Sequence, residues 1–111
     1  MTLDADAQNR LEIQRQLRIK IGEVGYTPYQ IWNMLVNLDF PADMYSVSRI
    51  NTTARNNQLF VDVGGLGISR DRNNARYYVP KSKLQGIIDI LHIACTIEDF
   101  ERAAGDSGYM V

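Results

Sequence analysis

The sequence has few of the residues that support metal or redox chemistry. It contains one cysteine, Cys95, and one histidine, His92, among 111 residues. A single cysteine excludes an internal disulfide and a cysteine-rich zinc site, and it agrees with a reducing compartment. His92 lies in the most apolar segment, away from any pair of carboxylates, which favours a packed histidine over a general base. We therefore expect no enzyme, no metal and no cofactor.

Long apolar runs and a basic leader are also lacking. No apolar run approaches the roughly 20 residues that a membrane-spanning helix needs. Residues 1–7 carry two aspartates and no basic residue, whereas a secretory signal would begin with positive charge and continue into an apolar stretch. We expect a cytoplasmic protein without membrane contact, folded as a single domain over residues 1–111 with flexible ends at 1–10 and 106–111.

Positive charge is concentrated in one part of the chain. Residues 49–83 hold seven lysines and arginines against two aspartates, a net charge of +5, while the remainder holds five against eleven acids, a net charge of −6. A nearly neutral protein with such a basic stretch has the charge distribution of a nucleic-acid-binding surface. The simpler alternative is a hairpin whose charges are only solvated.

Local patterns predict two helices in the first third of the chain. Residues 11–24 fit a helical apolar stripe, although residues 17–21 also alternate like a strand, and glycines follow at 22 and 25. Thr27, Pro28 and Gln30 are typical of a helix start, with a capping threonine, a proline in the first turn and a glutamine three residues after the cap. This second helix should run to about Leu38.

The segment from residue 42 to residue 57 is ambiguous. A helix capped by Asp43 or Ser46 would turn a polar face toward solvent, formed by Ser48, Arg49, Asn51, Thr52 and Arg55. The β-branched pair Thr52 and Thr53 and the alternation around Val47 instead suit a strand. Both assignments stay open on the sequence alone.

A basic β-hairpin is expected next. We expect strands at residues 58–63, 68–72 and 75–79, with a glycine-rich bend at 64–67, a reversal at Asn73 and Asn74, and Pro80 ending the pairing. Tyr77 and Tyr78 should point to opposite faces of their strand, one into the core and the other beside the hairpin surface.

The last third predicts a helix that is apolar on two sides. Ser82 is a plausible cap for a helix that reaches Ile97, and a helix with two apolar faces must be buried on both. We therefore expect a homodimer that uses residues of this helix, namely Leu84, Ile87, Ile88, Ile90, Leu91 and Ile93. Thr96 and Asp99 then suit the cap of a short final helix to Ala104.

Taken in order, these elements resemble the winged-helix DNA-binding fold over residues 27–91. Residues 27–31 resemble the opening of the first helix of a helix-turn-helix, residues 45–50 the start of a recognition helix, and residues 70–80 a wing. Residues 75–84 are also similar to the wing exit of excisionase-like proteins. The segment 38–43 between the two helices lacks the usual glycine. If residues 51–53 form a strand, the order becomes α-α-β-β-β-α and no helix can enter the major groove.

The resemblance implies an α+β fold, a small winged-helix-like domain with helices flanking a short antiparallel hairpin or three-stranded sheet. It implies a dimeric transcriptional regulator that binds duplex DNA, with base contacts from the helix and backbone contacts from the wing. The expected contact residues are Arg49, Asn51, Thr52, Arg55, Arg70, Arg72, Asn74, Arg76, Lys81 and Lys83. Two alternatives remain: a small inhibitor or adaptor that binds a protein through the arginines and tyrosines of the hairpin, and an RNA-binding α+β module.

Overall fold

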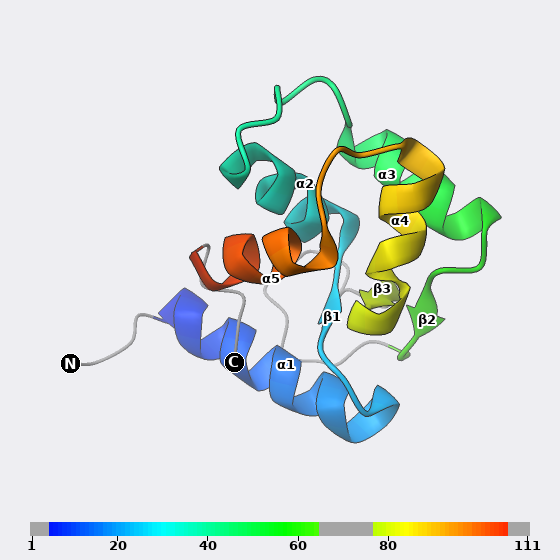
Figure 1. Ribbon diagram of the computed structural model, residues 1–111. Coiled ribbons are helices and arrows are strands. Elements are labelled where there is room, and N and C mark those ends of the chain that lie inside the picture. Colours follow the sequence, from blue (N-terminus) through cyan, green and yellow to red (C-terminus); the bar gives the residue numbers. More distant parts are fainter. Residues whose placement is uncertain (1–4, 65–76, 107–111) are drawn as a thin grey trace.

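The computed structural model describes residues 5–64 and 77–106 (Figure 1), and these form an α+β domain as expected. Helices flank a small antiparallel sheet. In chain order the elements are α1 (Ala5–Ile21), β1 (Gly25–Tyr26), α2 (Pro28–Asn37), α3 (Val47–Asn56), β2 (Val61–Asp62), β3 (Tyr77–Pro80), the short 3-10 helix η1 (Lys81–Lys83), α4 (Leu84–Leu91) and α5 (Ile97–Asp106). None of the helices in these two ranges is long and apolar enough to cross a membrane.

The sheet has the order β1-β3-β2, with both neighbouring pairs antiparallel. Gly25 lies opposite Pro80, and the amide of Lys81 donates to Val24 O at 3.0 Å. Gly25 and Pro80 form a non-hydrogen-bonded pair of the antiparallel strands. Pro80 therefore fits this position although it has no amide hydrogen to donate. The backbone polar groups of Gly25 bond instead to the side chain of Gln14 in α1. The edge strand β1 is therefore covered by an amide side chain rather than left open.

Helices cover both faces of the sheet. In Figure 1 α1 lies below the strands and α2 and α3 lie above them, while α4 overlaps β3 in this view and α5 lies beside β1. Side chains alternate accordingly: Tyr78 packs with Ile13 and Leu17 of α1, whereas Val79 joins the larger core on the other side. Gly25 permits the close approach of β1 to β3, because a Cβ there would lie 3.1 Å from Tyr78 Cβ. As predicted, one tyrosine of the pair is buried, Tyr78, and the other, Tyr77, is exposed.

Residues 47–56 are helical, which decides the ambiguous segment against a strand. Ser46 caps α3, its hydroxyl accepting the amide hydrogen of Arg49 at 3.1 Å. Ile50 and Ala54 are fully buried, and Thr53 faces the same way, so one of the two β-branched residues is used in packing. The gain from burying this stripe outweighs the weak helix propensity of the threonines.

The strand expected at residues 58–63 is shorter than predicted. Only Val61 and Asp62 pair with β3, because residues 57–59 complete the end of α3. Gln58 has a positive φ of 57°, and the amide of Leu59 donates to Ala54 O at 2.9 Å, which closes the last turn of the helix. Leu59 then packs against Gly86 of α4, where a Cβ would come within 2.9 Å of Leu59 Cδ2.

The prediction of one long helix from Ser82 to Ile97, apolar on two sides, is wrong. α4 ends at Leu91 because His92 adopts a left-handed conformation, with φ 54°, and the chain turns into α5. Thr96 and Asp99 cap α5 reciprocally, as predicted, with the amide of Thr96 donating to Asp99 and the amide of Asp99 donating to Thr96 Oγ1. The apolar residues are therefore shared between a helix and the turn that follows it.

The homodimer surface expected on this helix needs correction. Its residues fill the protein's own core, and Ile90 alone is left exposed, at 41%. The buried members of the set are Leu84, Ile87, Ile88, Leu91 and Ile93. A second subunit is not needed to cover them, so the reason given for a dimer does not hold, although dimerisation itself remains a prediction.

Several other predictions lie outside the described residues. These are the strand at 68–72, the reversal at Asn73 and Asn74, the start of the strand at 75–76 and the tail at 107–111. α1 begins at Ala5, within the segment 1–10 for which flexibility is expected, and earlier than the expected start at Leu11.

Candidate nucleic-acid interface

α3 carries a polar, uncompensated positive face. Ser48, Arg49, Thr52 and Arg55 are exposed, and Asn51 is half-buried at the edge of this face. These positions follow the helical repeat, so they share the side opposite the buried stripe of Ile50, Thr53 and Ala54. The helix has two arginines and no acidic residue. It can therefore attract an anion without neutralisation from within the helix.

Arg49 is held against the turn that precedes α3. Its guanidinium donates to Met44 O at 3.2 Å and lies 5.5 Å from the centre of the Tyr45 ring. Tyr45 in turn meets Phe40 edge to face, with the ring centres 5.9 Å apart. A guanidinium has five N–H donors, so Arg49 keeps donors for a ligand while its position is fixed from behind.

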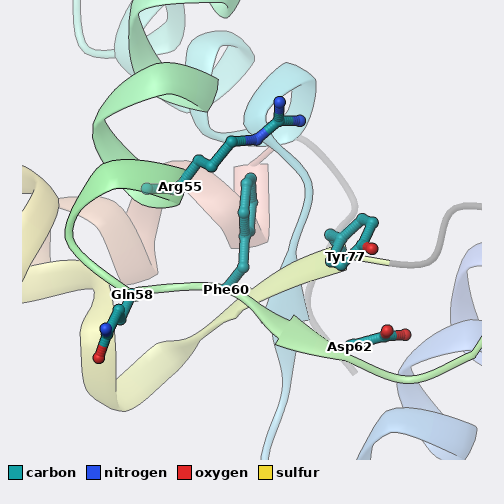
Figure 2. A pocket seen from close by; sticks show the side chains of 6 residues that line it. Arg55, Gln58, Phe60, Asp62 and Tyr77 are labelled. Carbon is teal, nitrogen blue, oxygen red and sulfur yellow. The ribbon is translucent and has the colours of Figure 1, made fainter.

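Arg55 lies beside an open hollow at the C-terminal end of α3, which we call the α3 hollow (Figure 2). Its volume is about 550 Å³, and it is lined by Ala54, Arg55, Gln58, Phe60, Asp62 and Tyr77. Among the described residues, the Arg55 side chain has no hydrogen-bond or ion-pair partner. The site thus combines a cation with aromatic rings from the segments flanking β2 and β3.

The rings of Phe60 and Tyr77 pack together in the α3 hollow. Their centres are 5.9 Å apart and their planes are inclined by 45°. Phe60 is half-buried and rests on the main core, whereas Tyr77 is 47% exposed. The sequence predicted that one of Tyr77 and Tyr78 lies beside the contact surface, without deciding which, and it gave no indication of Phe60. The pairing of a strand residue with one in the preceding loop could not be read from local alternation.

The two predicted lysines are placed differently. Lys83 Nζ donates to Gln58 O at 3.3 Å, so this charge lies at the C-terminal end of α3 beside the hollow. Lys81 Nζ lies 2.8 Å from a carboxylate oxygen of Glu101 in α5, and that ion pair offsets its charge. The structure therefore places Lys83 at the end of the helix that carries Arg55, and it joins Lys81 to a different helix.

The remaining predicted contact residues, Arg70, Arg72, Asn74 and Arg76, lie outside the described residues. The strand ends on either side of them are described. Asp62 of β2 is paired with Tyr77 of β3, and both line the α3 hollow. The Asp62 carboxylate also accepts the amide hydrogen of Gly64 at 2.8 Å. The paired strand residues that precede and follow the basic segment in the sequence, Asp62 and Tyr77, therefore both belong to the α3 hollow.

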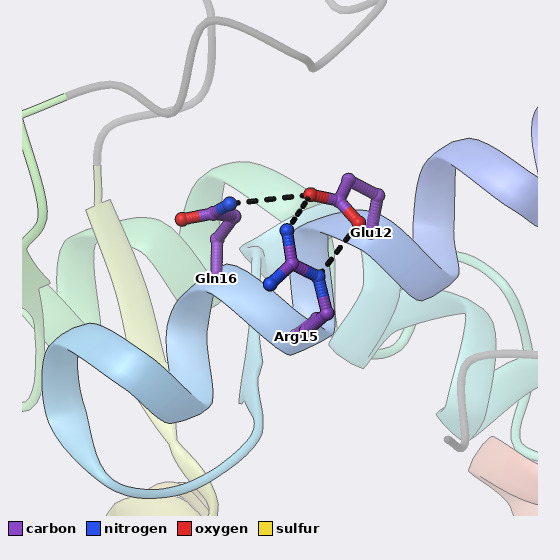
Figure 3. Close-up of polar contacts among 3 residues, drawn as sticks. All are labelled: Glu12, Arg15 and Gln16. Carbon is purple, nitrogen blue, oxygen red and sulfur yellow. Dashed lines mark hydrogen bonds and ion pairs between the residues drawn. The ribbon is translucent and has the colours of Figure 1, made fainter.

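On α1, across the sheet, Arg15 is paired with Glu12 of the same helix (Figure 3). Arg15 donates from Nε to Glu12 Oε2 at 2.8 Å and also contacts Oε1, and Gln16 donates to Oε1 at 3.2 Å. These hydrogen bonds, that from Arg15 above all, lower the pKa of Glu12 to about 2 and raise the pKa of Arg15. α1 thus differs from α3, whose Arg55 has no such partner.

The described residues offer little for metal or thiol chemistry. Within residues 5–64 and 77–106 no group of three or more histidine, cysteine and carboxylate side chains could hold a metal ion. Burial, and secondarily the charge of Asp99, raises the pKa of the Cys95 thiol to about 11, so this thiol is protonated at neutral pH. What the site can do is bind: donate hydrogen bonds, attract an anion and offer a ring for stacking.

Comparisons with protein-family models, with curated proteins and with solved structures find no match to this chain.

Proposed function

We propose that this protein is a winged-helix DNA-binding regulator that reads duplex DNA with α3. The observation that carries the proposal is the exposed, polar face of α3, which has two arginines and no acidic residue, on a helix that follows α2 after the connection 38–46. The order α1-β1-α2-α3-β2-β3 and the sheet order β1-β3-β2 support it, since β2 and β3 pair in the manner of the two strands of a winged-helix hairpin. α2 and α4 both pack against α3 and brace it from behind.

On this proposal the side chains divide the work by position. Asn51 and Thr52 face the base edges of the major groove, where asparagine can bridge adenine, and Arg55 approaches a phosphate at the end of the helix. Arg49, already fixed by Tyr45, serves the same groove near the start of the helix. Lys83 and the arginines of the wing approach phosphates and supply affinity that depends on salt. Lys81, paired with Glu101, contributes less.

The test compares two arginines on opposite sides of the sheet. Binding of a labelled duplex is measured by fluorescence anisotropy over a series of salt concentrations. Replacing Arg55 by alanine should weaken binding about tenfold and lower the slope of log K against log salt by about one if its contact is to phosphate. Arg15→Ala removes the same charge from α1, where it is paired with Glu12, and should leave binding unchanged.

Two outcomes would contradict this proposal. One is the absence of duplex binding at low salt, and the other is an equal effect of Arg55→Ala and Arg15→Ala. Competition with single-stranded RNA separates DNA binding from the RNA-binding alternative.

A protein-binding inhibitor or adaptor is the second candidate, and the exposed Tyr77 beside Arg55 favours it. Tyrosine and arginine are enriched at protein interfaces. Capture of one protein at fixed stoichiometry that survives nuclease treatment, together with loss of this capture in Tyr77→Ala, would support the adaptor over the DNA-binding regulator.

A further inference from the structure

The α3 hollow has features that a continuous duplex lying along α3 would not use. Its volume of about 550 Å³ is in the range of small-molecule sites, roughly 300–1,000 Å³. A helix in the major groove reads base edges, and these present no ring face for stacking because neighbouring base pairs cover the faces. An aromatic pair beside such a helix therefore suits a base that is out of the duplex stack.

The aromatic pair is arranged to receive a planar ligand. Phe60 rests on the core and fixes the position of the pair, while nearly half of the Tyr77 surface is open. In Figure 2 the Phe60 ring points toward the Arg55 side chain, and Tyr77 lies across from both. Stacking on tyrosine and phenylalanine is the common way for proteins to hold unpaired bases, and it tolerates any base because each has a π face.

Arg55 supplies the charge that a nucleotide needs. It extends from the last turn of α3, and the described part of the chain gives it no carboxylate partner. A phosphate attached to a base on Tyr77 could be bound by this guanidinium, which can hold phosphate in a bidentate manner.

We infer that the α3 hollow binds an unpaired nucleotide, with the base stacked on Tyr77 and the phosphate held by Arg55. The nucleotide can come from two sources. One is an unpaired nucleotide in a DNA strand whose duplex part lies on α3, and for this source the inference rests on the proposed function. The other is a free mononucleotide, which would bind to the same tyrosine ring and arginine. In the first case the protein prefers DNA with an overhang or bulge over blunt duplex.

The experiment uses two duplexes of equal length, one blunt and one with a single unpaired 2-aminopurine as an overhang. The full-length protein should bind the second on the order of tenfold more tightly, and binding should quench the 2-aminopurine fluorescence through stacking. Tyr77→Ala should remove this preference, whereas Tyr77→Phe should keep it because the ring remains.

The chain offers a matched control in a second aromatic pair. Tyr29 of α2 is 57% exposed and lies 5.7 Å from Trp32, ring centre to ring centre, so its geometry resembles that of Tyr77 and Phe60. Tyr29→Ala removes an equally exposed ring outside the α3 hollow and should leave the preference for the overhang intact. Circular dichroism of each variant checks that the fold is retained.

A titration with adenosine monophosphate alone separates the two ligand sources. Saturable binding that is lost in Tyr77→Ala assigns the hollow to a free nucleotide and supports the site even if duplex binding fails. Equal affinity for blunt and overhanging duplex, without binding of the mononucleotide, would overturn the inference. Because blunt duplex can still bind through α3 in that case, the proposed function would stand.

Discussion

At the scale of single residues, Gln14 shows how one side chain can join two layers. It is almost fully buried, its amide nitrogen donates to Gly25 O at 2.8 Å and its oxygen accepts the Gly25 amide hydrogen at 3.1 Å. The side chain acts as a short extra strand along the edge of β1. α1 is therefore fastened to the sheet by polar bonds as well as by the packing of Leu17.

Replacing Gln14 by alanine should destabilise the fold strongly. It would leave a buried N–H and a buried C=O of Gly25 without partners, which costs roughly 2–4 kcal/mol of unfolding free energy. Gln16→Ala, two residues along the same helix and bonded only to the surface carboxylate of Glu12, should change stability by less than about 0.5 kcal/mol. Urea denaturation followed by circular dichroism measures both. Equal losses would show that the Gln14 bonds contribute nothing particular.

At the scale of elements, the start of α3 depends on one hydroxyl. Ser46 accepts the amide hydrogen of Arg49, and no other side chain in the described part of the chain caps this end of α3. Ser46→Ala should lower the unfolding free energy by about 1 kcal/mol, while Ser46→Asp should retain most of the stability. Ser48→Ala, at an exposed site inside the helix, is the matched control and should be near neutral. A loss with Ser48→Ala as large as with Ser46→Ala would contradict the capping role.

Elements with local start signals were predictable, and those decided by packing were not. Thr27 and Gln30 form the expected capping box of α2, with mutual hydrogen bonds of 2.9 and 3.2 Å, because capping chemistry is contained within four residues. The choice between helix and strand at residues 47–56 depended on burying Ile50 and Ala54 against α2, which no local pattern contains.

The end of α4 was equally hidden from the sequence. The residue that ends a helix in a left-handed conformation is usually glycine, but at the end of α4 it is His92. In the candidate site, too, the part set by a local pattern was predictable and the part set by tertiary packing was not. The exposed face of α3 was predictable once helicity was assumed, whereas the α3 hollow brings Phe60 of one segment onto Tyr77 of another and needs the sheet register to be known.

At the scale of the whole molecule, the two sides of the sheet differ in how their arginines are used. On α1 Arg15 is paired with Glu12, while on α3 Arg55 has no partner among the described residues. An anion that approaches Arg55 therefore meets a guanidinium that pairs with no described carboxylate, whereas the charge of Arg15 is offset by Glu12.

A homodimer, if it uses α4, must use Ile90. This is the one residue of the predicted set that is exposed, since the others pack inside the chain. A dimer would let two copies of α3 read half-sites one helical turn apart, which is how paired recognition helices gain specificity.

Sedimentation equilibrium at tens of micromolar should then give the dimer mass, and Ile90→Arg should give the monomer with an unchanged circular dichroism spectrum. Ile19→Arg, at an exposed isoleucine of α1, is the matched control and should leave the dimer intact. A wild-type monomer at these concentrations would contradict dimerisation, and a dimer insensitive to Ile90→Arg would place its interface on another surface.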